Sequence, residues 1–384
     1  MAPTSSTLAP APTRPAPETP GHPGRTPSSR APGRRGSRLL ALDGMRLVAA
    51  LMVALYHFTG RGGTISASWG VSPSRLFPGL SELTVYGCLG VQFFFLISGF
   101  VICMSSWGRS LGDFFRSRVA RLYPAYWVAL VLVGAATFVL PVVMHPLRLD
   151  EFLVNVTMFQ MPMGTPRVLG VCWTLWVEVR FYALFALLVV ARGVTYRKVV
   201  LFCAVWTLLA VICKGAKTEL TEQLVMPDYA PFFIGGLALY LIHRHGGNLL
   251  LWGLVAVSWL LGQSSATNGL WQPGTHGDFT RDPHMIVLVV TLCYAAVAAV
   301  ALGWLRWASW PGLALIGALT YPFYLVHEHL GWFVIRVLHR GWGLPAWTTL
   351  TVTVSGMLVL AWLIHRYVER PLGPRLKRGL KAVR

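Results

Sequence analysis

The stretch Leu42-Asp43-Gly44-Met45-Arg46 is followed by ten mostly apolar residues and then by His57. At about 100° per residue, the eleven steps from Arg46 to His57 turn a helix through roughly three full circles. The two side chains are therefore predicted to share one helix face, roughly 16 Å apart along the axis. Ionisable groups in an apolar helix are costly unless they face protein or a wet cavity, so this face is a candidate site. The alternative is that both side chains extend to the lipid headgroups.

The composition indicates a membrane protein. Of the 384 residues, 55% are hydrophobic and only 12% are charged, whereas soluble domains carry about 25% charged residues. The formal net charge of +19 would suggest a nucleic-acid partner in a soluble protein. Here the basic residues flank apolar runs, which orientation in a bilayer explains better, so no nucleic acid is expected.

The cysteines give no sign of a metal centre. The six lie in or beside apolar segments and include no C-x-x-C pair. They are predicted to be small buried hydrophobes, with no zinc site, other metal or disulfide framework.

The order of apolar runs predicts an all-α, polytopic membrane helix bundle. The expected number of membrane spans is about ten. This count is good to about one, because several of the runs approach the lower length limit for crossing about 30 Å of hydrocarbon. The predicted spans are 42–59, 84–105, 123–143, 171–191, 198–214, 229–243, 248–263, 284–303, 312–337 and 347–366. A weakly amphipathic piece is expected at 150–161, and no internal repeat suggests a transporter built of two halves.

Two basic ends flank one membrane domain over 39–370. Residues 1–38, rich in Pro, Ala, Ser, Thr and Arg, are expected to be a disordered tail without a signal-peptide core. Residues 371–384 are expected to be a basic cytoplasmic tail. With the N-terminus inside, 22 of the 33 lysines and arginines fall on the cytoplasmic side and nine on the other. This asymmetry predicts that both termini are cytoplasmic.

The imidazole of His57 is the first candidate for chemistry. A histidine near its ordinary pKa can act as a general base at neutral pH, taking a proton from an acceptor hydroxyl as that oxygen attacks an acyl group. Arg46 lies too far along the helix to touch the same atom. It is better suited to a remote anionic part of a substrate, such as a phosphate.

A basic run that includes Arg116, Arg118 and Arg121 lies where the third span begins. Arg118 and Arg121 are three residues apart and share a helix face. Guanidinium groups suit phosphates because they offer paired donors in one plane, so an anionic, nucleotide-like donor is predicted to bind there. The alternative is a set of charges that only orients the chain beside anionic lipid.

The fourth span carries an acid and a base, Glu178 and Arg180. Glu178 lies one helical turn before Tyr182, so those two side chains can meet. Glu178 is predicted either to orient a catalytic imidazole or to pair with Arg180, Arg46 or another buried base.

The segment from Leu319 to His329 contains another intramembrane cluster. Tyr321, Tyr324 and His327 recur every three residues and roughly follow one face. Pro322 is expected to kink the helix and free a backbone carbonyl. These side chains, together with Tyr182, are predicted to bind substrate, although Tyr and His are also common at membrane interfaces.

Six motifs in order resemble the acyltransferase-3 family of integral membrane O-acyltransferases, over about residues 40–370. The most specific is the arginine, ten residues, histidine spacing of Arg46 and His57. The others are 93–100 (Phe-Phe-Phe-Leu-Ile-Ser-Gly-Phe), Arg118-x-x-Arg121 before Tyr123-Pro124, 173–182, 321–327 and Glu369-Arg370-Pro371. That family includes acetylases of bacterial polysaccharide and peptidoglycan and acyltransferases of macrolide sugars.

The resemblance implies acyl transfer from a cytoplasmic thioester, usually acetyl-CoA, to a sugar hydroxyl. His57 would be the essential histidine with Arg46 as its paired residue, and Arg118 and Arg121 would lie at the donor side. The expected protein is a multi-pass enzyme of the bacterial cytoplasmic membrane that acylates a cell-envelope glycan, uses acyl-CoA as co-substrate and holds no tightly bound cofactor. His57 is expected either to activate the acceptor hydroxyl or to accept the acyl group transiently. The alternatives are an acyltransferase tailoring a glycosylated natural product such as a macrolide, and a transporter or flippase. The soluble hydrolase-like domain of many relatives is not expected here.

Overall fold

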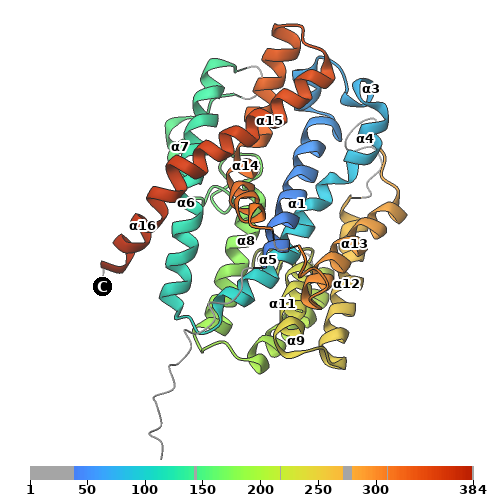
Figure 1. The fold of residues 1–384 in the computed structure, drawn as a ribbon, viewed down its shortest axis with the longest axis vertical. Coiled ribbons are helices and arrows are strands. Elements are labelled where there is room, and N and C mark those ends of the chain that lie inside the picture. Colours follow the sequence, from blue (N-terminus) through green and yellow to red (C-terminus); the bar gives the residue numbers. More distant parts are fainter. Residues whose placement is uncertain (1–38, 142–144, 217, 271–278, 309, 383–384) are drawn as a thin grey trace, which may run out of the picture. The chain divides into compact units, whose positions relative to one another are not determined.

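The computed structural model describes residues 39–382 apart from 142–144, 217, 271–278 and 309. The predicted N-terminal tail over 1–38 therefore lies outside the described residues. Within the described part every regular element is helical, so the chain has the predicted all-α architecture (Figure 1).

The helices follow one another along the chain from Leu40 to Ala382. The longer ones are α1 (Leu40–Thr59), α5 (Gly90–Ser106), α6 (Leu111–Val139), α8 (Cys172–Phe185), α9 (Tyr196–Ala216), α11 (Ala230–His245), α12 (Leu249–Leu270), α13 (Pro283–Ala301), α14 (Gly312–Ile335), α15 (Ala346–Ile364) and α16 (Arg370–Ala382). Shorter helices are α2 (Thr64–Trp69), α3 (Pro73–Leu76), α4 (Pro78–Thr84), α7 (Leu149–Val156) and α10 (Glu219–Leu224). Element η1 (Val85–Leu89) is a short 3-10 helix, and η2 (Ala186–Val190), η3 (Arg336–Gly341) and η4 (His365–Glu369) are short π-helical segments.

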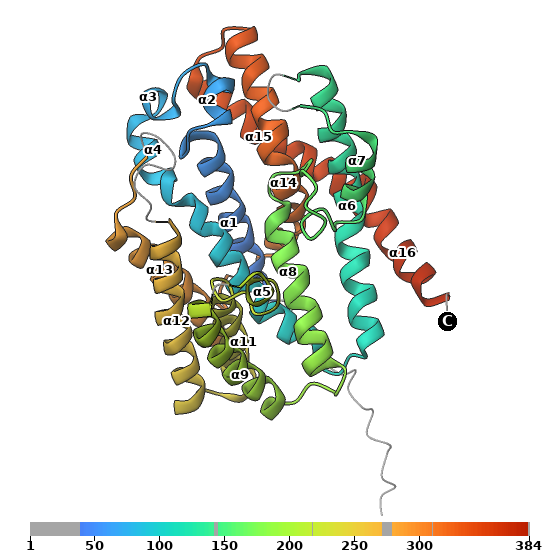
Figure 2. The ribbon, with the colours of Figure 1, turned by 180° about the vertical axis from the view of Figure 1, so that it is seen from behind.

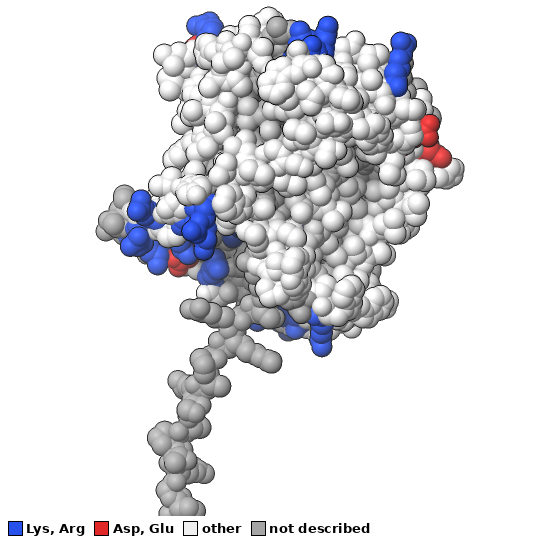
Figure 3. Space-filling view, turned by 45° about the horizontal axis from the view of Figure 1, so that its top comes forward, with Lys and Arg blue, Asp and Glu red and all other residues white. Residues whose placement is uncertain are grey.

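Within the described residues, 8 helices are long and apolar enough to cross a membrane. The predicted runs at 229–243 and 312–337 correspond to α11, which has 16 residues, and α14, which has 24, and neither is among those eight. Large apolar side chains such as Leu201, Leu208 and Val359 are exposed on the outside of the bundle. In Figure 3 the lysines and arginines gather toward the margins of the face, with a broad uncharged expanse between them. The protein is a polytopic membrane protein.

The third span begins earlier than its predicted start at residue 123. Helix α6 starts at Leu111 because Ser110 caps it, its hydroxyl accepting a hydrogen bond from the backbone N–H of Asp113 at 3.1 Å. Pro124 lies inside the helix rather than near its start. The arginines of the basic run are consequently carried on the helix itself.

Glycines allow the central helices to approach closely. A Cβ at Gly99 of α5 would overlap the carbonyl of Phe233 in α11, and a Cβ at Gly236 of α11 would overlap the carbonyl of Leu96. Backbones in such contact pack through van der Waals forces, which matter in lipid because lipid tails are as apolar as the side chains. These close approaches hold α5 firmly against α11.

The helix with Arg46 and His57 lies at the centre of the bundle. Helix α1 packs against α14, α5 and η1, while α8 packs against α5 and η2 packs against α6 (Figure 2). Helix α16 (Arg370–Ala382) packs against α6 and includes most of the segment 371–384 that is expected to be a tail. Five helices, α1, α5, α6, α8 and α14, therefore surround the candidate site.

Candidate active site

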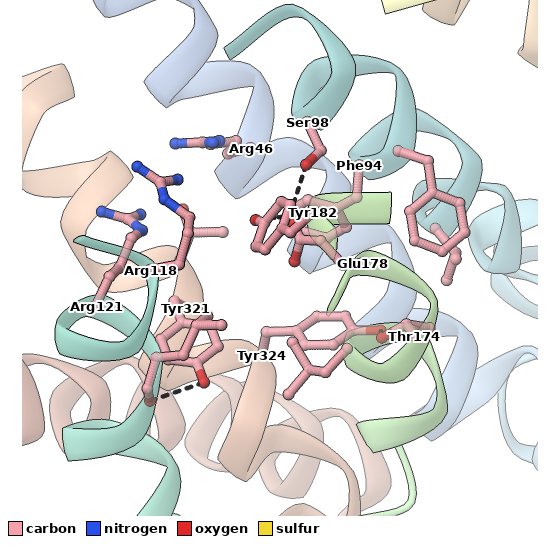
Figure 4. Close-up of a pocket in the computed structure, with 15 residues that line it drawn as sticks. Arg46, Phe94, Ser98, Arg118, Arg121, Thr174, Glu178, Tyr182, Tyr321 and Tyr324 are labelled. Carbon is pink, nitrogen blue, oxygen red and sulfur yellow. Dashed lines mark hydrogen bonds between the residues drawn. The ribbon is translucent and has the colours of Figure 1, made fainter. Parts of the chain in front are cut away.

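One cavity gathers most of the predicted site residues. Its volume is about 90 Å³, and we call it the arginine cavity because Arg46, Arg118 and Arg121 line it together (Figure 4). Figure 4 shows these three guanidinium groups side by side, opposite the side chains of α8. The other lining residues are Val91, Phe94, Phe95, Ser98, Leu122, Thr174, Leu175, Glu178, Tyr182, Thr320, Tyr321 and Tyr324. The fold thus joins the basic run of α6 to the arginine of α1.

The acid of this cavity is held by hydroxyl groups. Glu178 accepts a hydrogen bond from Ser98 at 2.6 Å and another from Tyr182 one turn later. The predicted meeting of Glu178 and Tyr182 is confirmed. Arg180, a predicted alternative partner, instead donates to the carbonyls of Glu222 and Gln223. Glu178 therefore faces the three arginines with its carboxylate already oriented.

The remaining residues of the basic and aromatic clusters have separate contacts. Arg116 pairs with Asp113 at 3.1 Å and is not among the residues that line the cavity. Tyr321 donates to the Leu122 carbonyl at 3.0 Å, which ties α14 to α6. The Tyr324 hydroxyl lies 2.9 Å from the Thr174 hydroxyl. Both tyrosines thus form part of the cavity wall between helices.

The second cavity contains the imidazole of His57. Its volume is about 780 Å³, within the usual range for sites that enclose a small molecule, and we call it the histidine cavity. Its other lining residues are Val53, Tyr56, Arg61, Thr64, Cys88, Val91, Gln92, Gln160, Met161, Gly164, Thr165, Pro166, Arg167, Gly170, Val171, Trp173, Tyr324, Glu328, His329 and Trp332. Residues near the two ends of α1 therefore line two different cavities, Arg46 the arginine cavity and His57 the histidine cavity.

An unpredicted carboxylate lies beside His57. Glu328 Oε1 is 3.5 Å from His57 Nε2 and 3.9 Å from Arg61 Nη1, and its other oxygen is 4.0 Å from His329 Nε2. A Cβ at Gly170 would overlap this carboxylate, so the glycine makes room for it. Glu328 is an acid inside a predicted span, and the rule that singled out Glu178 would have found it.

His327, predicted to bind substrate, lies behind His57 instead. It is fully buried and is not among the residues lining either cavity. Its Nε2 lies 2.9 Å from His57 Nδ1, and its Nδ1 lies 2.8 Å from the carbonyl oxygen of Tyr324. Trp332 fixes the backbone at the same point by donating to the His57 carbonyl at 3.1 Å.

The two cavities adjoin. The side chains of Val91 from α5 and Tyr324 from α14 line both. Arg46 and His57 face protein-lined space rather than lipid, as their shared helix face predicts. Val91 and Tyr324 lie at the boundary between the two spaces.

Polar atoms without hydrogen-bond partners point to a polar occupant of the histidine cavity. Among the described residues, Arg61 Nε, Gln92 Oε1, Gln160 Oε1 and Glu328 Oε2 are buried and have no hydrogen-bond partner. All four belong to residues that line this cavity. A buried polar group left without a partner costs about 1–3 kcal/mol, so these atoms favour a ligand with several hydrogen-bonding groups.

Comparison with known proteins identifies the family. A family model described as an acyltransferase domain matches residues 39–366. Acyltransferase MdmB of Streptomyces mycarofaciens is 28% identical over 377 residues, which cover 87% of this chain and 91% of that protein. Exopolysaccharide production protein ExoZ of Rhizobium meliloti is 30% identical over 320 residues, which cover 76% and 90%. No solved structure matches significantly.

The match spans the helices that surround both cavities, and it favours an enzyme over the transporter alternative. The predicted resemblance is confirmed: the chain belongs to the acyltransferase-3 family and is a multi-pass membrane acyltransferase.

Proposed function

We propose that this membrane O-acyltransferase moves an acyl group, most simply an acetyl group, from acyl-CoA to a sugar hydroxyl of a bacterial cell-envelope glycan. The arginine cavity serves the donor and the histidine cavity serves the acceptor. The observation that carries the proposal is that His57 lines a large cavity of mixed polar and apolar character that adjoins a narrow cationic one.

The donor assignment rests on charge and size. Three guanidinium groups favour phosphates, which accept paired hydrogen bonds. A volume of about 90 Å³ is too small for a nucleotide but suits a narrow chain. The phosphates of the donor are therefore assigned to Arg118 and the exposed Arg121, with Arg46 deeper along α1. The uncharged pantetheine arm then extends past Tyr324 toward His57.

The acceptor assignment rests on the mixed lining of the histidine cavity. Gln92, Gln160 and Arg61 offer hydrogen-bonding atoms, while Trp173 and Trp332 offer flat apolar surfaces. A sugar presents hydroxyl groups at its edges and C–H groups on its faces, so it matches both kinds of surface. We place the acceptor hydroxyl at His57 Nε2.

The chemical step uses His57 as a general base. Its Nε2 takes the hydroxyl proton while the oxygen forms a bond to the thioester carbonyl carbon. The C–S bond then breaks with its electron pair on sulfur, and the imidazolium returns the proton to the thiolate. The Glu328 carboxylate, 3.5 Å from Nε2, stabilises the transient imidazolium. Glu178 remains with the donor, because its carboxylate belongs to the arginine cavity.

Membranes containing the His57→Ala variant test the proposal with labelled acetyl-CoA. We expect acyl transfer to fall by at least about 10²-fold, the lower bound for loss of a general base, while the protein still inserts and accumulates. The exposed His284 provides a matched control as His284→Ala. Full activity of His57→Ala would overturn the proposal. Label in the cell-wall fraction supports a glycan acceptor, whereas label in a soluble small molecule would assign the acceptor to a natural product.

A further inference from the structure

We infer that His327 is a positioning residue that fixes the tautomer of His57 and leaves Nε2 as its basic nitrogen. The inference rests on the proposed role of His57 as a base. It starts from a chain of three groups: the Tyr324 carbonyl, the His327 ring and the His57 ring, joined by contacts of 2.8 and 2.9 Å.

The Tyr324 carbonyl sets the direction of the hydrogen bonds that join these three groups. A carbonyl oxygen only accepts hydrogen bonds, so His327 Nδ1 must carry a proton and donate it to Tyr324. The two residues are three apart in α14, a spacing at which a side chain reaches the backbone of the preceding turn. In a neutral ring the other nitrogen, Nε2, then carries the lone pair.

The surroundings of His327 keep its ring neutral. It is fully buried, and the rings of Phe58 and Phe323 lie against it at centroid distances of 6.3 and 5.7 Å. Among the described residues no carboxylate forms an ion pair with it, and a buried charge without such a partner is costly. His327 Nε2 is therefore an acceptor.

The tautomer of His57 follows from this acceptor. His57 Nδ1 lies 2.9 Å from His327 Nε2 and must donate, so the neutral ring carries its lone pair at Nε2. That nitrogen is the one beside Glu328 and belongs to the ring that lines the histidine cavity. After proton uptake at Nε2, His57 donates to His327 on one side and faces the Glu328 carboxylate on the other. No rearrangement of the ring is needed.

Two substitutions separate this role from simple packing. His327→Gln keeps a side-chain amide that can accept a hydrogen bond from His57 Nδ1, whereas His327→Phe keeps a ring and removes the acceptor. We expect His327→Phe to lower kcat by about 10- to 100-fold, the scale known for groups that orient metal-bound imidazoles. KM for acyl-CoA should stay within about twofold because the arginine cavity is intact. His327→Gln should keep kcat within a few-fold of wild type.

His339 provides a matched control, because it lies in η3, which continues directly from α14. His339 Nδ1 contacts the Leu344 carbonyl at 2.7 Å, as His327 does with Tyr324, but His339 is not among the residues lining either cavity. His339→Phe should retain wild-type kcat. A wild-type kcat in His327→Phe, or an equal loss in the Gln and Phe variants with normal accumulation, would overturn the inference.

A direct measurement does not depend on the variants folding. In wild-type protein with ¹⁵N-labelled histidine rings, NMR distinguishes protonated from unprotonated ring nitrogens, and the His57→Ala spectrum assigns the His57 signals. We expect Nδ1 protonated and Nε2 unprotonated in the resting protein. The opposite tautomer would refute the positioning role. If His57→Ala itself remained active, the proposed function would fail instead, so the two failures are distinguishable.

Discussion

The arginine and histidine cavities share two wall residues but differ in chemistry. The first measures about 90 Å³ and places three guanidinium groups opposite one carboxylate. The second measures about 780 Å³, and its lining includes two imidazoles, two guanidinium groups, a carboxylate and two glutamines. A narrow cationic space suits an anionic donor with a thin reactive arm, and a wide polar space suits a bulky acceptor. Arg46 and His57, near opposite ends of α1, therefore contribute to spaces of different size and composition.

Among the substitutions that test this difference between the cavities, removing the charge of Glu328 should cause the largest loss of kcat. With Glu328→Gln the imidazolium of His57 loses its facing carboxylate, so kcat should fall by about 10²- to 10³-fold, as when a preorganised electrostatic partner is removed. Steady-state kinetics of acyl transfer by the purified protein measure this change in kcat. Glu178→Gln should cost much less in kcat, because Ser98 and Tyr182 still orient the side chain. A larger loss of kcat in Glu178→Gln than in Glu328→Gln would exchange the roles of the two carboxylates. Glu82 is exposed, and Glu82→Gln serves as the control.

Removing an arginine should affect binding rather than turnover. Arg118→Ala deletes a charged donor from the arginine cavity, and a hydrogen bond to a charged group contributes about 1.5–3 kcal/mol. KM for acyl-CoA should therefore rise by about 10- to 100-fold with kcat changed far less. Titration of the donor at saturating acceptor measures this. Arg197→Ala, which removes an exposed arginine, should leave KM unchanged. A loss confined to kcat would argue against a donor site.

The smallest effect is expected at the shared wall. Tyr324→Phe keeps the ring between the cavities and removes only the hydroxyl that contacts Thr174 at 2.9 Å. Thr174 still donates to the Val171 carbonyl at 2.8 Å. The free energy of unfolding should fall by about 1 kcal/mol, seen as a lower Tm in detergent, and activity should change less than about threefold. The exposed Tyr367→Phe should leave Tm unchanged. A large loss of activity would show that the Tyr324 hydroxyl touches substrate.

The helices were largely predictable because the signal for a membrane helix is local. A run of about 20 apolar residues specifies a span by length alone, and the runs at 42–59 and 284–303 correspond closely to α1 and α13. The start of α6 was predicted too late. Its first turns are polar and basic, and hydropathy does not report a cap such as Ser110.

Several residues that line the two cavities were predictable from the sequence, but their arrangement was not. Helical period placed Arg46 and His57 on one face, and the three-residue spacing placed Arg118 and Arg121 together. Period does not report what other helices insert between two points on that face. Val91 and Tyr324 come from α5 and α14, and they lie at the boundary between the cavity that Arg46 lines and the cavity that His57 lines.

The membrane class, the order of helices and the family follow from the chain alone, because hydropathy and motif spacing are properties of neighbouring residues. Tertiary structure alone decided that Glu328 rather than Glu178 lies beside His57, and that His327 lies behind it. Residues 57 and 327 are 270 positions apart. Their contact depends on the packing of α1 against α14, which no local pattern in either helix specifies.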